Sequence, residues 1–349
     1  MRRSVYVAYT GGTIGMTRTP GGYAPAPGLL EARMREMPEL RSERVPGFTV
    51  HEYATLLDSA NMTPADWNAI AEDIAANYAH HDGFVVLHGT DTMAYTAAAL
   101  SFMLEGLAKP VVVTGSQIPI GEIRNDARGN LVTSLLVAGG ADDLPEVCLC
   151  FGAKLLRGNR AVKVSATGLD AFDSPNYPPL GDIGIGIEIH RDRVRRRAAG
   201  VPFRLQRCSP GAVAALRLFP GISAEVVANA LRPPLLGLVL ECYGVGNAPD
   251  RDRRLLAALG EASGRGVVIA DVTQCLRGRV DLGGYAAGSA LAEVGVIGGH
   301  DMTAEAALTK LLYLFGRGLP PEEVKREMQR DLRGELTPPP ASDADRRLA

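Results

Sequence analysis

The sequence lacks the features that would tie it to a membrane or to an oxidising compartment. Its five cysteines are odd in number and lie mostly within apolar runs, which predicts reduced core residues. Cys148 and Cys150 have no second pair at metal-ligand spacing, so no zinc site is predicted. The apolar stretch after Arg2 and Arg3 ends at Tyr9, too short for a signal peptide, and no run is long enough to cross a bilayer. These absences predict a cytoplasmic protein.

An excess of charge of one sign is also missing. Lys and Arg total 37 and Asp and Glu total 39, for a formal net charge of -2. We therefore predict no nucleic-acid partner and no membrane partner, and expect a small-molecule substrate. One local exception is the arginine-rich stretch 191–197. It could be a nucleic-acid patch, but a solvated strand or linker is favoured, and no function is assigned to it.

The pattern of apolar runs indicates an α/β fold. A chain of 349 residues with 46% hydrophobic residues exceeds the size at which one core usually divides, so two domains are expected. Short β-branched runs without alternation are typical of parallel strands covered on both faces. These runs lie at 5–9, 48–53, 84–87, 111–114, 147–151, 161–165, 237–241 and 267–270. The clearest helix spans 63–80, where Thr63 and Asp66 form a capping box around Pro64.

Changes of composition divide the chain. Residues 1–190 are predicted to form the larger N-terminal catalytic α/β domain, a mainly parallel sheet flanked by helices. Residues 191–212 form a linker, and 213–336 form a smaller, Rossmann-like α/β domain with helices near 250–263, 284–293 and 303–314. The proline-rich tail 337–349 is predicted to be disordered.

Polar segments directly follow several predicted strands, where open parallel sheets bind their ligands. These segments are 10–13, 58–61, 88–92 and 114–117. Segment 10–13 could cradle a phosphate, but TGGTIG matches neither nucleotide-binding fingerprint. Any one segment could be turn and capping residues, whereas several hydroxyls at one sheet edge suit acyl transfer. Lys163, in an otherwise apolar strand, is a candidate base, and an ordinary exposed strand lysine is an equal alternative.

Seven motifs together resemble the bacterial-type L-asparaginases of the asparaginase/glutaminase superfamily, and are most similar to the cytoplasmic type I branch. The motifs are YTGGTIG, DSANMTPADW, HGTDTMAYTA, TGSQIP, FDSPN, YGVGNAP and GGYAAGSAL. The resemblance covers about positions 4 to 336, and the combination of TGGTI with HGTDTM is specific to the superfamily.

The resemblance implies hydrolysis of L-asparagine to L-aspartate and ammonia, with Thr13 as the nucleophile and an acyl-threonine intermediate. It implies a second triad in which Lys163 draws protons through Thr90, and Asp91 holds both the lysine and the substrate ammonium. Backbone amides near Gly12 and Thr90 would face the oxyanion. The resemblance implies no metal or other cofactor.

The lid of the family is matched by segment 16–28, which is rich in Gly and Pro and is predicted to be a mobile surface loop. Tyr23 matches the lid tyrosine, which hydrogen-bonds near the nucleophile. An ordinary hairpin carrying a surface tyrosine is the alternative.

The substrate-binding residues implied by the resemblance come from both halves of the chain: Gly12, Asp58, Ser59, Thr90, Asp91 and Asn247. Ser59 would grip the substrate α-carboxylate. Ala60 stands where extracellular members usually carry Gln, which leaves the preference for Asn or Gln open. Asn247 would reach the site from the neighbouring subunit, which implies a homodimer or a dimer of dimers.

Regulation is expected to differ from that of the regulated type I enzymes. Those enzymes bind a second asparagine with an arginine just before the Ser/Cys-Tyr-Gly-Val-Gly motif, and Glu241 occupies this position here. A carboxylate cannot replace a guanidinium that binds a carboxylate. Weak or absent activation by asparagine is therefore predicted.

Two other functions are considered. The amidase subunit of a tRNA-dependent amidotransferase shares the signatures, but it is expected to carry an N-terminal extension, whereas TGGT begins at residue 10 here. A non-catalytic nucleotide-binding or regulatory module would tolerate the loss of Thr13 or Lys163, and both are present.

Overall fold

The computed structural model describes residues 2–140, 143–197, 200–209, 211–284 and 286–338, in two compact units. The first unit comprises Met1–Pro210 and Phe315–Arg317, and the second comprises Gly211–Leu314 and Gly318–Ala349. Strands and helices alternate in both units, which confirms the predicted α/β class. No helix in the described ranges is long and apolar enough to cross a membrane. Most of the predicted tail lies outside these ranges.

The first unit is built around one large sheet. Its strands run in the order β13-β12-β9-β8-β7-β5-β1-β4, and β4, β1, β5, β7 and β8 are mutually parallel. Their bounds are β1 (Ser4–Gly11), β4 (Gly47–Leu57), β5 (Gly83–Leu87), β7 (Val111–Thr114), β8 (Val147–Phe151), β9 (Lys154–Arg157), β12 (Gly181–Ile183) and β13 (Ile187–Ile189). Every residue of β5, β7 and β8 is buried, as the unalternating apolar runs predict.

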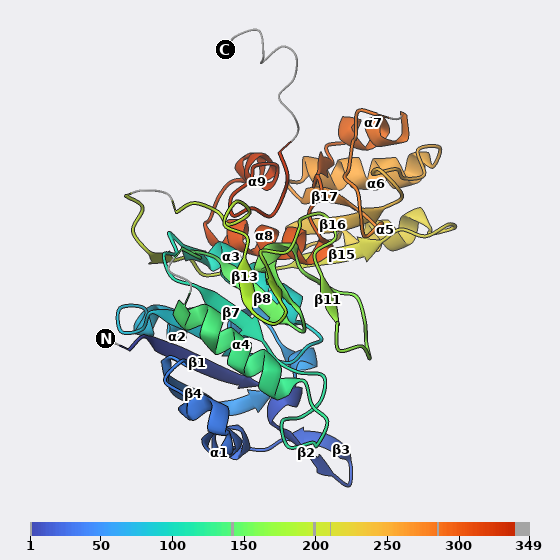
Figure 1. The fold of residues 1–349 in the computed structure, drawn as a ribbon. Helices are drawn as coiled ribbons and strands as arrows, with labels where there is room; N and C mark the ends of the chain where they lie inside the picture. Colours follow the sequence, from blue (N-terminus) through green and yellow to red (C-terminus); the bar gives the residue numbers. More distant parts are fainter. Residues whose placement is uncertain (1, 141–142, 198–199, 210, 285, 339–349) are drawn as a thin grey trace. The chain divides into compact units, whose positions relative to one another are not determined.

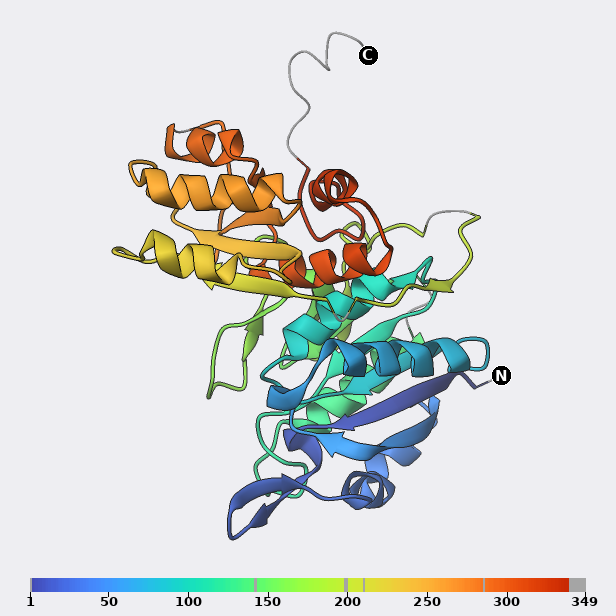
Figure 2. The same cartoon turned by 180° about the vertical axis from the view of Figure 1, so that it is seen from behind.

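Helices cover both faces of this sheet (Figures 1 and 2). Helices α1 (Leu29–Glu36) and α4 (Ala127–Gly140) pack on one face in a shared apolar core, and α2 (Pro64–Asn77) and α3 (Met93–Met103) cover the other. The predicted capping box at Thr63 is present, and α2 ends three residues before the predicted limit.

Short pairings complete the first unit. They are β2 (Met16–Thr19) with β3 (Gly22–Pro25), β6 (Leu104–Glu105) with β14 (Arg204–Leu205), and β10 (Val162–Lys163) with β11 (Phe172–Asp173). The 3-10 turns are η1 (Thr13–Gly15), η2 (Pro38–Arg41), η3 (Ser59–Asn61) and η4 (Gly158–Arg160). Segment 16–28, which is predicted to be a mobile surface loop, contains the antiparallel hairpin of β2 and β3, as the alternative of an ordinary hairpin describes.

The second unit contains a smaller parallel sheet in the order β15-β16-β17-β18. The strands are β15 (Val213–Arg217), β16 (Gly237–Cys242), β17 (Val268–Thr273) and β18 (Ile297–Gly298). The helices are α5 (Ala224–Ala230), α6 (Arg253–Gly264), α7 (Ala286–Glu293), α8 (Ala304–Gly316) and α9 (Pro321–Met328). Apolar side chains of α5, α6 and α7 share one core with β16 and β17.

A buried ion pair fastens the end of the described chain to α8. Lys310 and Glu335 are both fully buried, and Lys310 Nζ lies 2.5 Å from Glu335 Oε1. Lys310 also donates to the carbonyl oxygens of Met328 and Arg330 at 3.0 and 2.6 Å. These acceptors compensate for taking the ammonium out of water.

A second buried carboxyl, Asp271 on β17, has no such compensation. It is fully buried, and neither of its oxygens has a hydrogen-bond partner of normal geometry among the described residues. Burial raises its pKa to about 7, and an interaction with the Cys242 thiol opposes this rise only in part. A Cβ at Gly246 would lie 2.6 Å from Asp271 Oδ2, so this carboxyl packs directly beneath the backbone of the turn at 243–247.

We predict that Asp271 makes the protein less stable as the pH rises. Its pKa in the folded state is about 7, whereas the unfolded chain releases the proton near the ordinary aspartate pKa of 3.8. Stability therefore falls between these values, by on the order of 2–4 kcal/mol, and levels off above pH 7. Asp271→Asn keeps the shape of the neutral acid and should abolish this loss. Melting temperatures at pH 5 and pH 8 test the prediction, with the exposed Asp192→Asn as control. An equal pH-dependent loss in Asp271→Asn and the wild type would contradict it.

Candidate functional site

Three of the predicted polar segments meet at two glycines at the carboxyl ends of β1, β4 and β5. Gly12 has a φ of +85°, and a Cβ on it would lie 2.3 Å from the nitrogen of Gly89. A Cβ on Gly89 would lie 2.5 Å from Ser59 Oγ. No larger residue fits at Gly12 or Gly89 without moving these segments apart. The two glycines therefore bring segments 10–13, 58–61 and 88–92 into direct contact.

Thr13 follows Gly12 and begins the 3-10 turn η1, where its side chain is partly exposed. The amide of Gly12 donates to the carbonyl of Leu57 at 2.9 Å, so Gly12 itself cannot supply the expected oxyanion donor. The amide of Thr13 is the first of the turn. It donates no hydrogen bond to any residue that the structure describes. The available donor near Gly12 is therefore the Thr13 amide.

The structure brings Lys163 to the adjacent residues Thr90 and Asp91, which lie 73 and 72 positions earlier in the sequence. Lys163 Nζ donates to Thr90 Oγ1 at 2.8 Å and to Asp91 Oδ1 at 2.6 Å. The side chain of Lys163 is 19% exposed and that of Asp91 is 65% exposed. The lysine is therefore largely covered by protein, whereas the aspartate is open to solvent. Of the two alternatives for Lys163, the exposed strand lysine does not match this geometry.

Gln117 belongs to the same cluster, although sequence reasoning assigned it no role. Its Nε2 donates to the carbonyls of Ala166 and Gly168 at 3.2 and 3.1 Å, which leaves Oε1 to accept from Thr90 Oγ1 at 3.0 Å. Thr90 therefore donates to Gln117 and accepts from Lys163. The signal in the sequence was the position of Gln117 after β7, but spacing alone could not show which hydroxyl it bonds.

His88 supports this cluster through a hydrogen bond to Gly89, the residue before Thr90. It is fully buried, and burial lowers its pKa to about 4. Its Nδ1 lies 2.7 Å from the carbonyl of Gly89, and its Nε2 lies 2.8 Å from Thr96 Oγ1, which also accepts from Trp67 Nε1 at 3.0 Å. These partners assign a neutral ring that donates from Nδ1 and accepts at Nε2. His88 is a structural anchor for Gly89.

The segment after β4 is fixed by local hydrogen bonds. Asp58 caps η3 by accepting from the amide of Ala60 at 3.2 Å. Ser59 is buried, and its carbonyl accepts from Thr92 Oγ1 at 2.8 Å. Ser59 thus lies against the segment that carries Thr90 and Asp91.

Tyr23 is placed differently from the expectation. It lies on β3, is 47% exposed, and its hydroxyl donates to Glu122 Oε1 at 2.8 Å. This hydrogen bond raises the pKa of Tyr23. None of the hydrogen bonds of the described residues joins Tyr23 to Thr13, so the predicted contact near the nucleophile is not made in this structure.

Asn247 belongs to the second unit. Its backbone and that of Tyr243 exchange two hydrogen bonds, of 2.9 and 2.8 Å, which close the turn at 243–247. Its Oδ1 is buried and has no hydrogen-bond partner among the described residues. Because this atom is buried within the second unit, it would have to turn outward before it could contact another molecule.

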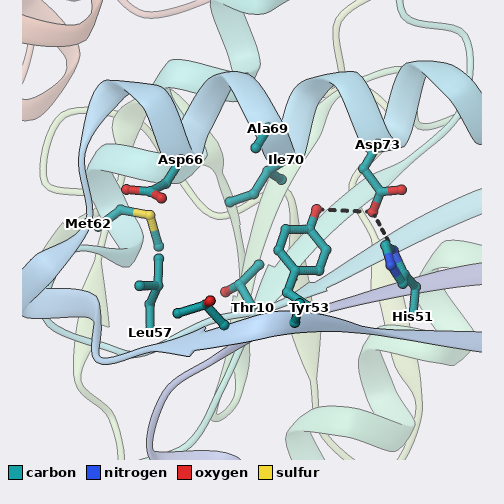
Figure 3. A pocket seen from close by; sticks show the side chains of 11 residues that line it. Thr10, His51, Tyr53, Leu57, Met62, Asp66, Ala69, Ile70 and Asp73 are labelled. Atoms are coloured by element: carbon teal, nitrogen blue, oxygen red, sulfur yellow. Dashed lines mark hydrogen bonds and ion pairs between the residues drawn. The ribbon is translucent and has the colours of Figure 1, made fainter.

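A cavity of about 600 Å³ lies behind the site, between β4 and α2 (Figure 3). Asp73 joins the two elements by accepting from Tyr53 at 3.0 Å and lying 3.1 Å from His51 Nδ1. Asp66, at the other end, is engaged by Thr63 in the capping box. Both carboxylates thus have structural partners. Within the described ranges, no group of three or more His, Cys, Asp or Glu side chains could hold a metal ion.

Comparisons with known proteins agree with this arrangement over nearly the whole chain. Residues 4–195 match the family model "Asparaginase, N-terminal", and residues 212–328 match "Glutaminase/Asparaginase C-terminal domain". The chain is 52% identical over 337 residues to L-asparaginase 1 of Escherichia coli K12, covering 97% of this chain and 99% of that protein. It is 35% identical over 293 residues to one subunit of the glutamyl-tRNA(Gln) amidotransferase of Pyrococcus horikoshii, covering 80% of this chain and 65% of that protein.

Among solved structures, L-asparaginase I from Vibrio cholerae superposes with a TM-score of 0.89 at 50% identity, covering 97% of this chain and all of the other. The two family models together account for both units, and the predicted resemblance is confirmed. The chain belongs to the asparaginase family.

Proposed function

We propose that this protein hydrolyses the side-chain amide of L-asparagine to L-aspartate and ammonia in the cytoplasm. The observation that carries the proposal is the contact of Lys163 with both Thr90 and Asp91, on a segment packed through Gly89 against the Thr13 turn. The full-length similarity to L-asparaginase 1 supports the same substrate.

In this mechanism Thr13 is the nucleophile. Its Oγ bonds to the amide carbon while its proton leaves toward Thr90, and neutral Lys163 accepts a proton from Thr90. The carbon–nitrogen bond then breaks, and the nitrogen leaves as ammonia after taking the proton that Lys163 received. Water then attacks the acyl-threonine ester, its hydroxyl bonds to the carbonyl carbon to give aspartate, and its other proton restores the Thr13 hydroxyl.

Two backbone amides are proposed to stabilise the oxyanion. They belong to Thr13 and Thr90, since the amide of Gly12 is already bonded to Leu57. A fixed donor of this kind contributes about 3–4 kcal/mol to the transition state. Gly12 contributes instead by its shape, because it lets the turn pack on Gly89.

Substrate binding is proposed to use Ser59 for the α-carboxylate and the exposed carboxylate of Asp91 for the ammonium, with Asp58 holding η3 in place. Asn247 would complete the site of a neighbouring subunit, in a homodimer or a dimer of dimers, after its buried Oδ1 turns outward. Tyr23 would have to exchange Glu122 for the nucleophile when substrate binds.

The alternative of an amidotransferase amidase subunit is supported by the Pyrococcus relative. Identity and coverage are both lower for that protein than for L-asparaginase 1, where the match spans 99% of the relative. Hydrolysis of free asparagine is therefore the better supported function.

The first test replaces the nucleophile. Thr13→Ala should lower ammonia release from L-asparagine at least about 1,000-fold, because no acyl-enzyme can form. Release from D-asparagine and L-glutamine, measured in parallel, defines the substrate. The exposed Thr49→Ala on β4 is a matched control that should keep full activity. Undiminished turnover by Thr13→Ala would rule out this nucleophile.

The second test addresses Gln117. Gln117→Leu removes the acceptor that orients the Thr90 hydroxyl, so kcat should fall about 10–100-fold while KM changes little. Gln329→Leu on the second unit is the control. Wild-type kcat in Gln117→Leu, or a rise in KM alone, would contradict the role of Gln117 in orienting Thr90.

The third test concerns activation by asparagine. Glu241 Oε2 lies 3.3 Å from Arg217 Nη1, so this carboxylate is already partnered on β15. The rate should rise hyperbolically with asparagine, and Glu241→Gln should leave the shape of the curve unchanged. A sigmoidal curve in the wild type that becomes hyperbolic in Glu241→Gln would refute this prediction.

A further inference from the structure

A pocket rich in arginine lies in the first unit, away from the candidate site. It has a volume of about 540 Å³, and its lining includes Arg191, Arg195, Arg196 and Arg197. These side chains come from the stretch 191–197, to which the sequence alone assigned no function. We call this cavity the arginine pocket.

A buried ion pair holds the backbone of this stretch. Glu146 and Arg157 are 5% and 4% exposed, and Arg157 Nε lies 2.6 Å from Glu146 Oε2. Glu146 Oε1 also accepts from the amide of Arg195 at 2.6 Å, and Arg157 Nη2 donates to the carbonyl of Arg193 at 2.8 Å. The pocket arginines are therefore carried on a backbone that the first unit fixes in place, unlike those of a solvated linker.

The described lining carries more positive than negative charge. Among the described residues its one carboxylate is Asp143, which lies 3.6 Å from Arg191. Arg196 and Arg197 are exposed and form no ion pair with any residue that the structure describes. Guanidinium groups gathered in one hollow repel each other until an anion enters, and they bind phosphate oxygens through two parallel hydrogen bonds.

The other walls of the pocket are apolar. Ala108, Pro145 and Val194 line it beside the arginines. Ala108 precedes β7 and Pro145 precedes β8, so the pocket lies at the amino ends of the strands. The candidate site lies at their carboxyl ends, and a ligand in the pocket would leave the site open.

We propose that the arginine pocket binds a small anion that carries a chain of phosphate groups. The guanidinium groups hold the phosphates, and the apolar walls accommodate any carbon-containing part. A free inorganic polyphosphate and a nucleoside triphosphate share this chemistry.

Calorimetry of the full chain with sodium tripolyphosphate and, separately, with ATP tests the proposal. We expect saturable 1:1 binding per chain of at least one of them, weakened by 0.5 M salt. Equal affinities identify the phosphate chain as the recognised part, and tighter binding of ATP identifies the nucleoside as a second contact. Arg196→Gln with Arg197→Gln should raise Kd at least about tenfold.

The matched control is Arg253→Gln with Arg254→Gln, an exposed adjacent pair on α6 that removes the same charge. This control should bind as the wild type does, and melting temperatures of both double variants verify folding independently of catalysis. The proposal is overturned if neither anion binds at millimolar concentration, or if both double variants lose affinity equally. Tighter binding of a short DNA duplex than of either anion would also overturn it.

Discussion

The contact between the backbones of Gly12 and Gly89 is the constraint on which the candidate site depends. A single added Cβ at Gly12 would lie 2.3 Å from the nitrogen of Gly89, so the turn after β1 and the segment after β5 touch without any side chain between them. Thr13 is the next residue after one glycine, and Thr90 is the next after the other. Thr13, the proposed nucleophile, and Thr90, which is proposed to receive its proton, are thus each one residue from this contact. The contact fixes how far apart their two backbones lie.

The direction of each hydrogen bond in the cluster follows from its fixed members. An ammonium at Lys163 can only donate, and Gln117 donates both of its amide hydrogens to carbonyls. Thr90 must therefore accept from Lys163 and donate to Gln117 Oε1. Proton transfer through Thr90 therefore requires Lys163 to lose its proton first. The directions of these hydrogen bonds, together with the identity of the residues, thus determine the order of proton transfers proposed for the site.

Much of this arrangement could be predicted from the sequence. Unalternating apolar runs located β5, β7 and β8, because strands covered on both faces contain few polar positions, and the Thr63 capping box located α2. Gln117, however, bonds to Thr90 across 27 positions, and no local pattern specifies such a partner. Tyr23 was linked to the nucleophile by resemblance, whereas in this structure its hydroxyl is held by Glu122. Folding of the stretch 191–197 against Glu146 likewise depends on tertiary contacts that composition does not encode.

The chain of hydrogen bonds from Trp67 through Thr96 and His88 to Gly89 has a consequence for how the site responds to its surroundings. While the imidazole is neutral, the direction of each of these hydrogen bonds is fixed, and burial lowers the pKa of His88 to about 4. Histidine is the side chain that most readily senses physiological acidity, and here its position shields it from that acidity. The hydrogen bond that holds Gly89, next to Thr90, therefore does not change with the pH of the solution in the physiological range. The acid and base groups of the site can change charge while the backbone that carries Thr90 keeps its conformation.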